Sequence, residues 1–158
     1  MKFLFIVQGE GRGHFTQAIT LEDMLLRNGH QVVEVLVGKS SSRTLPGFFN
    51  RSIQAPVKRF TSPNFLPTAE NKRADLKKSF AYNLIHVPEY FRSMCYINQR
   101  IKETGAEVVI NFYELLTGLT YALFRPSVPY VCIGHQYLFL HNHFEFPRKS
   151  VIQLSTED

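Results

Sequence analysis

A glycine-rich loop with one histidine is the first place in this sequence where chemistry could occur. The stretch QGEGRGHFTQA, residues 8–18, follows the apolar run 3–7 and precedes a helical pattern. Glycines let backbone amides approach a ligand, and amides at the start of a helix favour anionic or oxygen-rich groups. His14 falls in the first helical turn, where an imidazole can accept a proton from a hydroxyl. We therefore predict His14 as a catalytic base, with the alternative that it only caps or packs the turn.

The loop fits a dinucleotide-binding fingerprint only in part. That fingerprint reads Gly-x-Gly-x-x-Gly after a first strand, and His14 takes the place of the third glycine after Gly9 and Gly11. The third glycine normally allows close packing of helix and strand, so a histidine is a poor substitute there. The expected acidic residue would be Glu34, which lies inside the apolar run 32–37 instead of after it. A nucleotide-dependent oxidoreductase is therefore kept only as a third interpretation.

Buried strands alternate with helices along the chain. Apolar runs are typical of strands that are covered on both faces, and residues 3–7, 32–37, 108–112 and 130–133 are wholly or mostly apolar. Residues 57–60 could form a further short strand. This alternation predicts an α/β fold, in which one Rossmann-like domain over residues 1–158 has an open parallel sheet with helices on both faces.

Apolar residues with helical spacing fill the segments between these runs. They lie at 18–25, at 115–124, and at 80–101 with a break expected at Pro88. We interpret the stripe from Phe80 to Ile101 as core. The polar stretch 61–79 is expected to form an irregular loop.

Ligands of open parallel sheets bind beyond the carboxyl ends of the strands. Three segments are expected at that edge: the loop that contains His14, the residues after 108–112, and the residues after 130–133. The predicted substrate-binding residues are Gly9, Gly11, Arg12, Gly13, Thr16, Tyr113, Glu114, His135 and Gln136.

Residues 9–38, GEGRGHFTQAITLEDMLLRNGHQVVEVLVG, resemble the opening of glycosyltransferases with the two-domain B-type (GT-B) fold. In that superfamily a first strand leads into a Gly-x-Gly-Gly-His-like loop, a helix, a Gly-His-x-Val segment and a second strand. The matching positions are Gly11, Gly13, His14, Gly29, His30 and Val32. The resemblance continues more weakly through 106–118 and 128–136. The relatives that it implies are the peptidoglycan N-acetylglucosaminyltransferase, the diacylglycerol galactosyltransferases and the natural-product glycosyltransferases.

The resemblance implies a function for the chain as one half of such an enzyme. It would be the N-terminal, acceptor-binding domain of a sugar-nucleotide-dependent glycosyltransferase that transfers a hexosyl group to an acceptor hydroxyl. His14 would be the base, and Glu114 would orient or contact the acceptor. The C-terminal donor-binding domain, which would hold the sugar nucleotide, is absent from this chain, so we expect no cofactor here and no turnover by the chain alone. The alternative is a non-catalytic binding module or the subunit of a split enzyme.

Composition and charge restrict the expected partners. The chain carries a formal net charge of +5, and no apolar run approaches the ~18 residues that cross a bilayer, so we expect a cytoplasmic protein. Cations and aromatic residues in the segment 58–78 would allow peripheral contact with an anionic membrane, where a lipid-linked acceptor would lie, although an ordinary charged loop explains them too. The expected partner is therefore a small-molecule or lipid-linked acceptor, and no motif indicates nucleic acid.

No metal site is expected. The two cysteines have no Cys-x-x-Cys spacing. His135, His141, His143 and Glu145 form a cluster in the sequence, but a tail without fixed supporting groups is a weak basis for a metal site.

Overall fold

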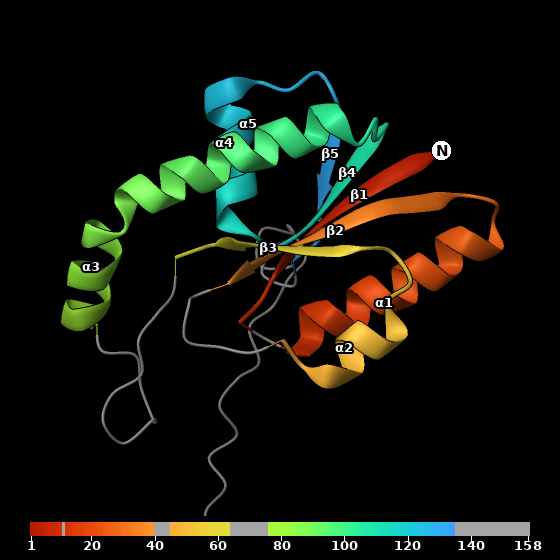
Figure 1. The fold of residues 1–158 in the computed structure, drawn as a ribbon, viewed down its shortest axis with the longest axis horizontal. Coiled ribbons are helices and arrows are strands. Elements are labelled where there is room, and N and C mark those ends of the chain that lie inside the picture. The colour runs from red at the N-terminus through yellow and green to blue at the C-terminus, as the bar shows by residue number, and fades with distance from the viewer. Residues whose placement is uncertain (11, 40–44, 64–75, 135–158) are drawn as a thin grey trace, which may run out of the picture.

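The structure, a computed structural model, describes residues 1–10, 12–39, 45–63 and 76–134. Within them the strands are β1 (Lys2–Gln8), β2 (Gln31–Lys39), β3 (Val57–Thr61), β4 (Val108–Phe112) and β5 (Tyr130–Cys132). The helices are α1 (Arg12–Arg27), α2 (Gly47–Ser52), α3 (Leu76–Ile85), α4 (Val87–Glu103) and α5 (Leu115–Phe124). Figure 1 shows the sheet running through the centre of the molecule.

The strands form one parallel sheet with β1 at its centre. The strand order is β3-β2-β1-β4-β5, and every neighbouring pair is parallel. This order, with helical crossovers, is that of a Rossmann-like fold. The predicted α/β fold class is confirmed. Because the chain leaves β1 on one side for β2 and returns on the other side to β4, a crevice is expected beyond the carboxyl end of β1.

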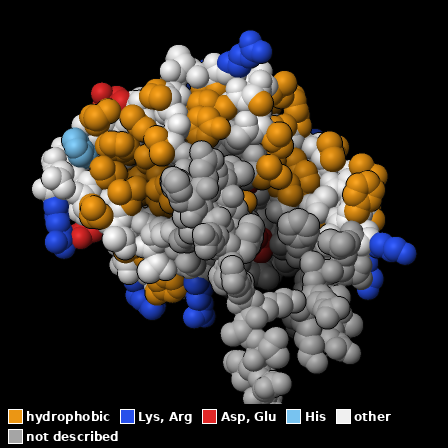
Figure 2. All heavy atoms as spheres, turned by 180° about the vertical axis from the view of Figure 1, so that it is seen from behind, with side chains coloured by type: hydrophobic (Ala, Val, Ile, Leu, Met, Phe, Trp, Pro, Cys, Tyr) orange, Lys and Arg blue, Asp and Glu red, His pale blue; other side chains and the backbone are white. Residues whose placement is uncertain are grey.

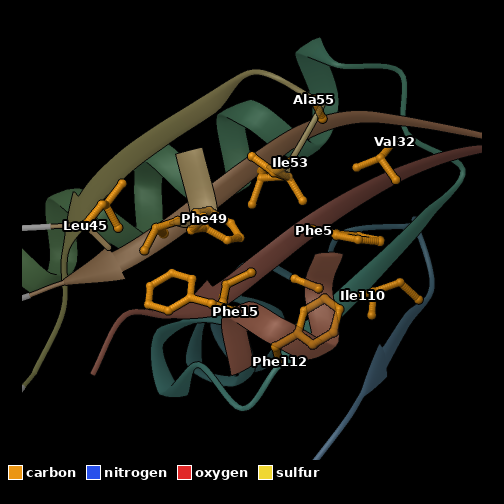
Figure 3. Close-up of a cluster of buried hydrophobic side chains, with 13 residues drawn as sticks. Phe5, Phe15, Val32, Leu45, Phe49, Ile53, Ala55, Ile110 and Phe112 are labelled. Carbon is orange, nitrogen blue, oxygen red and sulfur yellow. The ribbon is translucent and has the colours of Figure 1, made fainter. Parts of the chain in front are cut away.

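Side chains alternate between the two faces of the sheet and build a core on each. On the face covered by α1 and α2, Phe5 and Phe112 meet edge to face at 5.1 Å, and Phe15 of α1 lies 4.6 Å from Phe49 of α2 (ring centroids; Figure 3). On the other face, Leu4, Ile6 and Leu36 pack against α4 and α5 through Ile97, Ile101 and Leu116. Both faces of β1 and β2 are thus covered, which explains their continuous apolar sequences.

The predicted helix 80–101 is two helices. The break falls at His86, between α3 and α4, and Pro88 lies in the first turn of α4, where its missing N–H costs nothing. The interpretation of the whole stripe as core is wrong for its first half. Phe80 is 72% exposed and Phe91 is 49% exposed, whereas Ile97 and Ile101 are buried. The reason is that α3 extends past the sheet, as Figure 1 shows, so only the later turns of α4 cover it.

The predicted loop 61–79 is partly helical, because α3 already begins at Leu76. Residues 64–75 lie outside the described residues.

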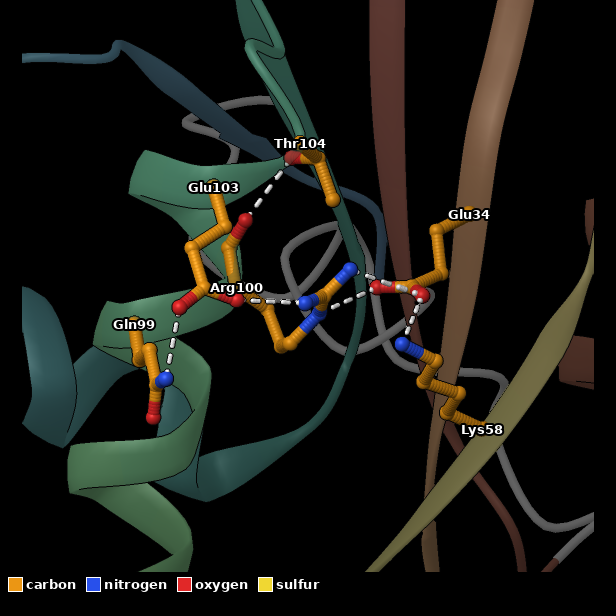
Figure 4. A network of polar contacts seen from close by, with 6 residues as sticks. All are labelled: Glu34, Lys58, Gln99, Arg100, Glu103 and Thr104. Atoms are coloured by element: carbon orange, nitrogen blue, oxygen red, sulfur yellow. Dashed lines mark hydrogen bonds and ion pairs between the residues drawn. The ribbon is translucent and has the colours of Figure 1, made fainter.

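Glu34 of β2 is buried in an ion-pair network (Figure 4). Its carboxylate accepts two hydrogen bonds from Arg100 of α4, from Nε at 2.8 Å and from Nη2 at 3.1 Å, and Nζ of Lys58 lies 2.9 Å away. The hydrogen bond and the negative charge of Glu34 raise the pKa of Arg100 above its usual value, against the effect of burial. The network joins α4 to β2 and β3.

Candidate functional site

A pocket of about 510 Å³ lies at the carboxyl ends of the strands. β1 contributes Gln8, the following loop contributes Glu10, and β4 with the turn after it contributes Asn111, Tyr113 and Glu114. Further walls come from the segment after β3, from α3, from α5 and from β5. This is the edge where the sequence predicts the site, and Tyr113 and Glu114 both line it.

At Gly9, the residue after β1, the backbone lies very close to the backbone of β2. Its N–H donates to the carbonyl oxygen of Gly38 at 2.7 Å, and a Cβ at this position would lie 2.5 Å from the same oxygen. Backbone atoms cannot give way as a flexible side chain can, so residue 9 must be glycine for this approach. Gly13, in the first turn of α1, is exposed and has open space where its Cβ would be.

The two glycines therefore predict opposite results on substitution. Gly9→Ala is expected to lower the free energy of unfolding by roughly 1–3 kcal/mol, because the β1 end must move away from Gly38. Gly13→Ala is expected to be neutral or to raise stability by up to about 1 kcal/mol, the helix-propensity difference. Urea denaturation of both variants measures this, and equal losses would show that the close approach at Gly9 is not rigid.

His14 lies beside the pocket and is not among its lining residues. Its half-buried ring stacks on Tyr113, with centroids 6.1 Å apart and planes 16° apart. Tyr113 itself lines the pocket, so the imidazole stacks on a residue of the pocket wall. Tyr113 has φ 60°, a left-handed conformation that is costly for a residue with a Cβ. Such strain at a pocket wall is a recognised sign of a functional position.

Asn111 holds the turn that carries Tyr113. Its side-chain oxygen accepts from the backbone N–H of Glu114 at 2.9 Å, and its amide nitrogen donates to the carbonyl oxygen of Glu114 at 3.1 Å. Both groups of the amide are thereby used to close the turn after β4. Asn111 is a positioning residue that the sequence analysis missed, because an asparagine at a strand end is an ordinary turn residue.

Glu114 is the buried acid of the pocket. The residue caps α5, because Oε1 accepts from the backbone N–H of Leu116 at 3.2 Å, and Oε1 also accepts from Oγ of Ser62 at 2.5 Å. A methyl group on Gly38 would overlap Oε2. Burial raises the pKa of Glu114 to about 7, the hydrogen bonds from Ser62 and Leu116 oppose this, and the charge of Glu10 adds to it.

The raised pKa of Glu114 predicts a stability loss at high pH. The folded chain holds this proton up to about pH 7, whereas the pKa of an unfolded glutamate has its ordinary value of 4.5. The stabilisation is therefore present below pH 4.5 and falls as the pH rises from there to about 7. Between pH 5 and pH 8 the wild type is expected to lose about 2 kcal/mol more than Glu114→Gln, whose amide oxygen can still accept both hydrogen bonds. Denaturant unfolding at the two pH values measures the difference, and parallel pH profiles would contradict it.

The other predicted site residues do not all meet in this pocket. Arg12 and Thr16 are exposed on α1, where Oγ1 of Thr16 donates to the carbonyl oxygen of Arg12 at 2.9 Å. Thr16 borders a second hollow of about 410 Å³ along α1, whose wall includes Phe112 and Ile133. Gly11, His135 and Gln136 lie outside the described residues.

The sequence analysis also missed Ser62 and Glu10 as pocket residues. Ser62 follows β3 in a segment without a motif, and only the sheet order brings it to Glu114. Glu10 belongs to the glycine-rich loop, and no feature of the sequence distinguishes it as a pocket residue. Glu34, the candidate for the acidic residue of a dinucleotide fingerprint, forms ion pairs with Arg100 and Lys58, which argues against the oxidoreductase interpretation.

Several apolar side chains stand exposed near the pocket. They belong to α3, α4, α5 and β5, and Figure 2 shows apolar patches on the face seen from behind. Across the described stretches of the chain, no helix has both the length and the apolar character to span a membrane. The same residues contain no cluster of three or more His, Cys, Asp or Glu side chains arranged to hold a metal ion.

The chain was compared with families, curated proteins and solved structures. No family model matches the sequence, and a search of curated proteins found no match. Among solved structures, the crystal structure of Acinetobacter baumannii MurG aligns with a TM-score of 0.45 and 18% identity. The alignment covers 83% of this chain and 33% of the MurG chain, so this chain spans about a third of that protein. A likeness of this size says nothing of activity.

Proposed function

We propose that this chain is the acceptor-binding domain of a sugar-nucleotide-dependent glycosyltransferase that transfers a hexosyl group to a hydroxyl. The observation that carries the proposal is the stack of His14 on Tyr113, beside a pocket at the carboxyl ends of the central strands. The match of Gly11, Gly13 and His14 to the family's loop supports it. We place the protein in the cytoplasm, with the donor site outside these 158 residues.

The proposed chemistry follows from the position of the imidazole. His14 takes the proton from the acceptor hydroxyl as that oxygen attacks the anomeric carbon of the sugar. The bond from the anomeric carbon to the leaving oxygen breaks, and the nucleoside diphosphate departs with its electron pair. Tyr113 holds the imidazole in place, and Glu114 contacts the acceptor from the pocket wall.

A transfer assay tests the proposal. The protein encoded by the complete reading frame is incubated with UDP-glucose, UDP-galactose or UDP-N-acetylglucosamine and with diacylglycerol or an aromatic alcohol. We expect UDP release that requires both substrates, with a glycosylated product in the mass spectrum, and no release by the 158-residue chain alone. A folded complete protein that glycosylates no acceptor would overturn the assignment.

A binding module is the second candidate. The exposed apolar side chains of α5 and β5 favour it, because such surfaces commonly serve assembly. In that case the complete protein binds a partner chain and releases no UDP in the same assay.

A further inference from the structure

The strand β3 lies at the edge of the sheet (Figure 1). Among the strands that the structure describes, it pairs only with β2. Along a strand, the backbone groups of successive residues point to opposite sides, so every second residue bonds to the same neighbour. The N–H of Ser62 donates to the last residue of β2 at 3.2 Å, which turns the backbone groups of Phe60 and Lys58 toward β2 as well. The N–H and C=O groups of Val57 and Arg59 therefore point away from the sheet.

A hollow of about 470 Å³ lies beside this edge, between β3 and α4. Oγ of Ser93 on α4 donates to the carbonyl oxygen of Thr61 at 2.7 Å and fixes the helix to the strand at one point. The hollow shares no lining residue with the pocket at the carboxyl ends of the strands. It is therefore a separate surface, and its described walls are Arg59, Phe60, Thr61, Glu89, Arg92, Ser93 and Tyr96.

The hollow carries more positive than negative charge. Arg59 and Arg92 are exposed, and Glu89 is the one acid among the described lining residues. Within the described part of the chain, neither arginine forms an ion pair. Both guanidinium groups are thus available to a carboxylate, which arginine binds through two parallel hydrogen bonds.

The charge of β3 acts against pairing with a second copy of itself. Basic side chains on an edge strand are a common protection against such pairing. An antiparallel second β3 would bring Lys58 and Arg59 close to the same two cations, and like charges on facing strands are destabilising. A strand that carries carboxylates would meet the same cations favourably, so the edge discriminates between the two occupants.

We infer that the β3 edge binds an extended acidic segment of a partner protein, which adds a strand to the sheet. Its backbone bonds to the outward groups of Val57 and Arg59, and its carboxylates contact Arg59 and Arg92 across the hollow. In this mode of recognition, main-chain hydrogen bonds supply affinity and alternate side chains supply specificity. The inference goes beyond the proposed function, because it concerns a surface apart from the acceptor pocket.

Three matched peptides test the inference with the 158-residue chain. The first alternates threonine with glutamate, the second replaces every glutamate with lysine, and the third is the acidic peptide with proline at its centre. Two-dimensional NMR at low salt is expected to show the largest amide shifts at Arg59, Thr61 and Ser93 with the acidic peptide. The lysine peptide is expected to bind at least ~10-fold more weakly because like charges meet, and the proline peptide also at least ~10-fold more weakly because it lacks a central N–H.

Two substitutions at Arg59 separate the charge from the backbone contact. Arg59→Gln removes the charge and keeps the outward N–H, and it is expected to weaken the acidic peptide several-fold. Arg59→Pro also removes the N–H, which the bonds to β2 do not use, and it is expected to weaken the peptide further. Lys102→Gln, the same loss of charge on an exposed residue of α4 outside the hollow, should leave binding unchanged.

Several results would overturn the inference. The lysine peptide could bind as tightly as the acidic one, no peptide could bind, or the shifts could fall away from β3. Sedimentation that shows a dimer abolished by Arg59→Pro would make a second copy the occupant. Tighter binding of oligothymidine than of the acidic peptide, at the same residues, would make nucleic acid the occupant. None of these results affects the proposed activity, which the UDP-release assay decides separately.

Discussion

Replacing His14 with alanine is expected to slow glycosyl transfer by the complete protein roughly 100- to 10,000-fold, the usual contribution of a positioned general base. The loss should fall on kcat, because the imidazole acts on the proton that moves in the transition state and contributes little to holding the acceptor. The stack on Tyr113 gives the ring one orientation beside the pocket, and alanine leaves no group there to take the proton. Steady-state UDP release, with acceptor and donor varied in turn, measures the effect.

His30→Ala is the matched control for this substitution. His30 precedes β2, at the amino end of the sheet, where its ring meets Phe3 edge to face. Its removal is expected to leave transfer unchanged.

Tyr113→Gly adds a second test, because glycine accepts the left-handed conformation without strain while the ring that orients His14 is lost. An unimpaired His14→Ala enzyme would remove the imidazole from the mechanism. A Tyr113→Gly enzyme as fast as the wild type would remove the orienting role of Tyr113.

Replacing Arg100 with alanine is expected to lower the free energy of unfolding by roughly 3 kcal/mol, the largest stability effect predicted here. The side chain of Glu34 is only 4% exposed, and Arg100 supplies both of its hydrogen bonds from α4. Without the guanidinium, the buried carboxylate keeps, among the residues that the structure describes, only the Lys58 ammonium, which is half in solvent. The cost therefore comes from the charge left behind more than from the bond removed. Chemical denaturation followed by circular dichroism measures it.

Arg27→Ala provides the comparison for Arg100→Ala. Arg27 pairs with Asp23 at 2.7 Å on the exposed surface of α1, where both side chains are largely in water. Such pairs contribute less than about 1 kcal/mol, so this variant should remain close to the wild type. Similar losses in the two variants would mean that burial of Glu34 does not control the stability of the network.

The fold could be predicted because its signals are local. The apolar runs 3–7 and 32–37 are strands because both of their faces are covered, and that requirement is visible in the sequence itself. Gly29, which ends the α1 pattern, has φ 74°, as a glycine that follows a helix commonly does. The exposure of Phe80 could not be predicted in the same way. Helical spacing shows which residues share a face, but only the tertiary arrangement decides whether another element covers that face.

The site could be predicted only in part for a similar reason. The topology of a parallel sheet places the residues after β1 and β4 at one edge, so the location of Tyr113 and Glu114 at that edge could be predicted from the sequence. The contact of Ser62 with Glu114 joins residues 52 positions apart, and no motif marks it. His14 stacks on Tyr113, whose backbone is left-handed. A tyrosine rarely adopts this conformation, so the sequence does not predict it. The glycine-rich loop could be predicted because its motif is local. The pocket could not, because contacts between residues far apart in the sequence form it.

The most direct test of the account is where an acceptor-like molecule binds. Two-dimensional NMR of the 158-residue chain, titrated with octyl glucoside, reports this residue by residue. The account predicts the largest amide shifts at Tyr113, Glu114 and Gly118, with the His14 ring signals moving alongside them. Shifts confined to Thr20, Leu21 and Met24, which border the second hollow along α1, with Tyr113 and Glu114 unmoved, would contradict it.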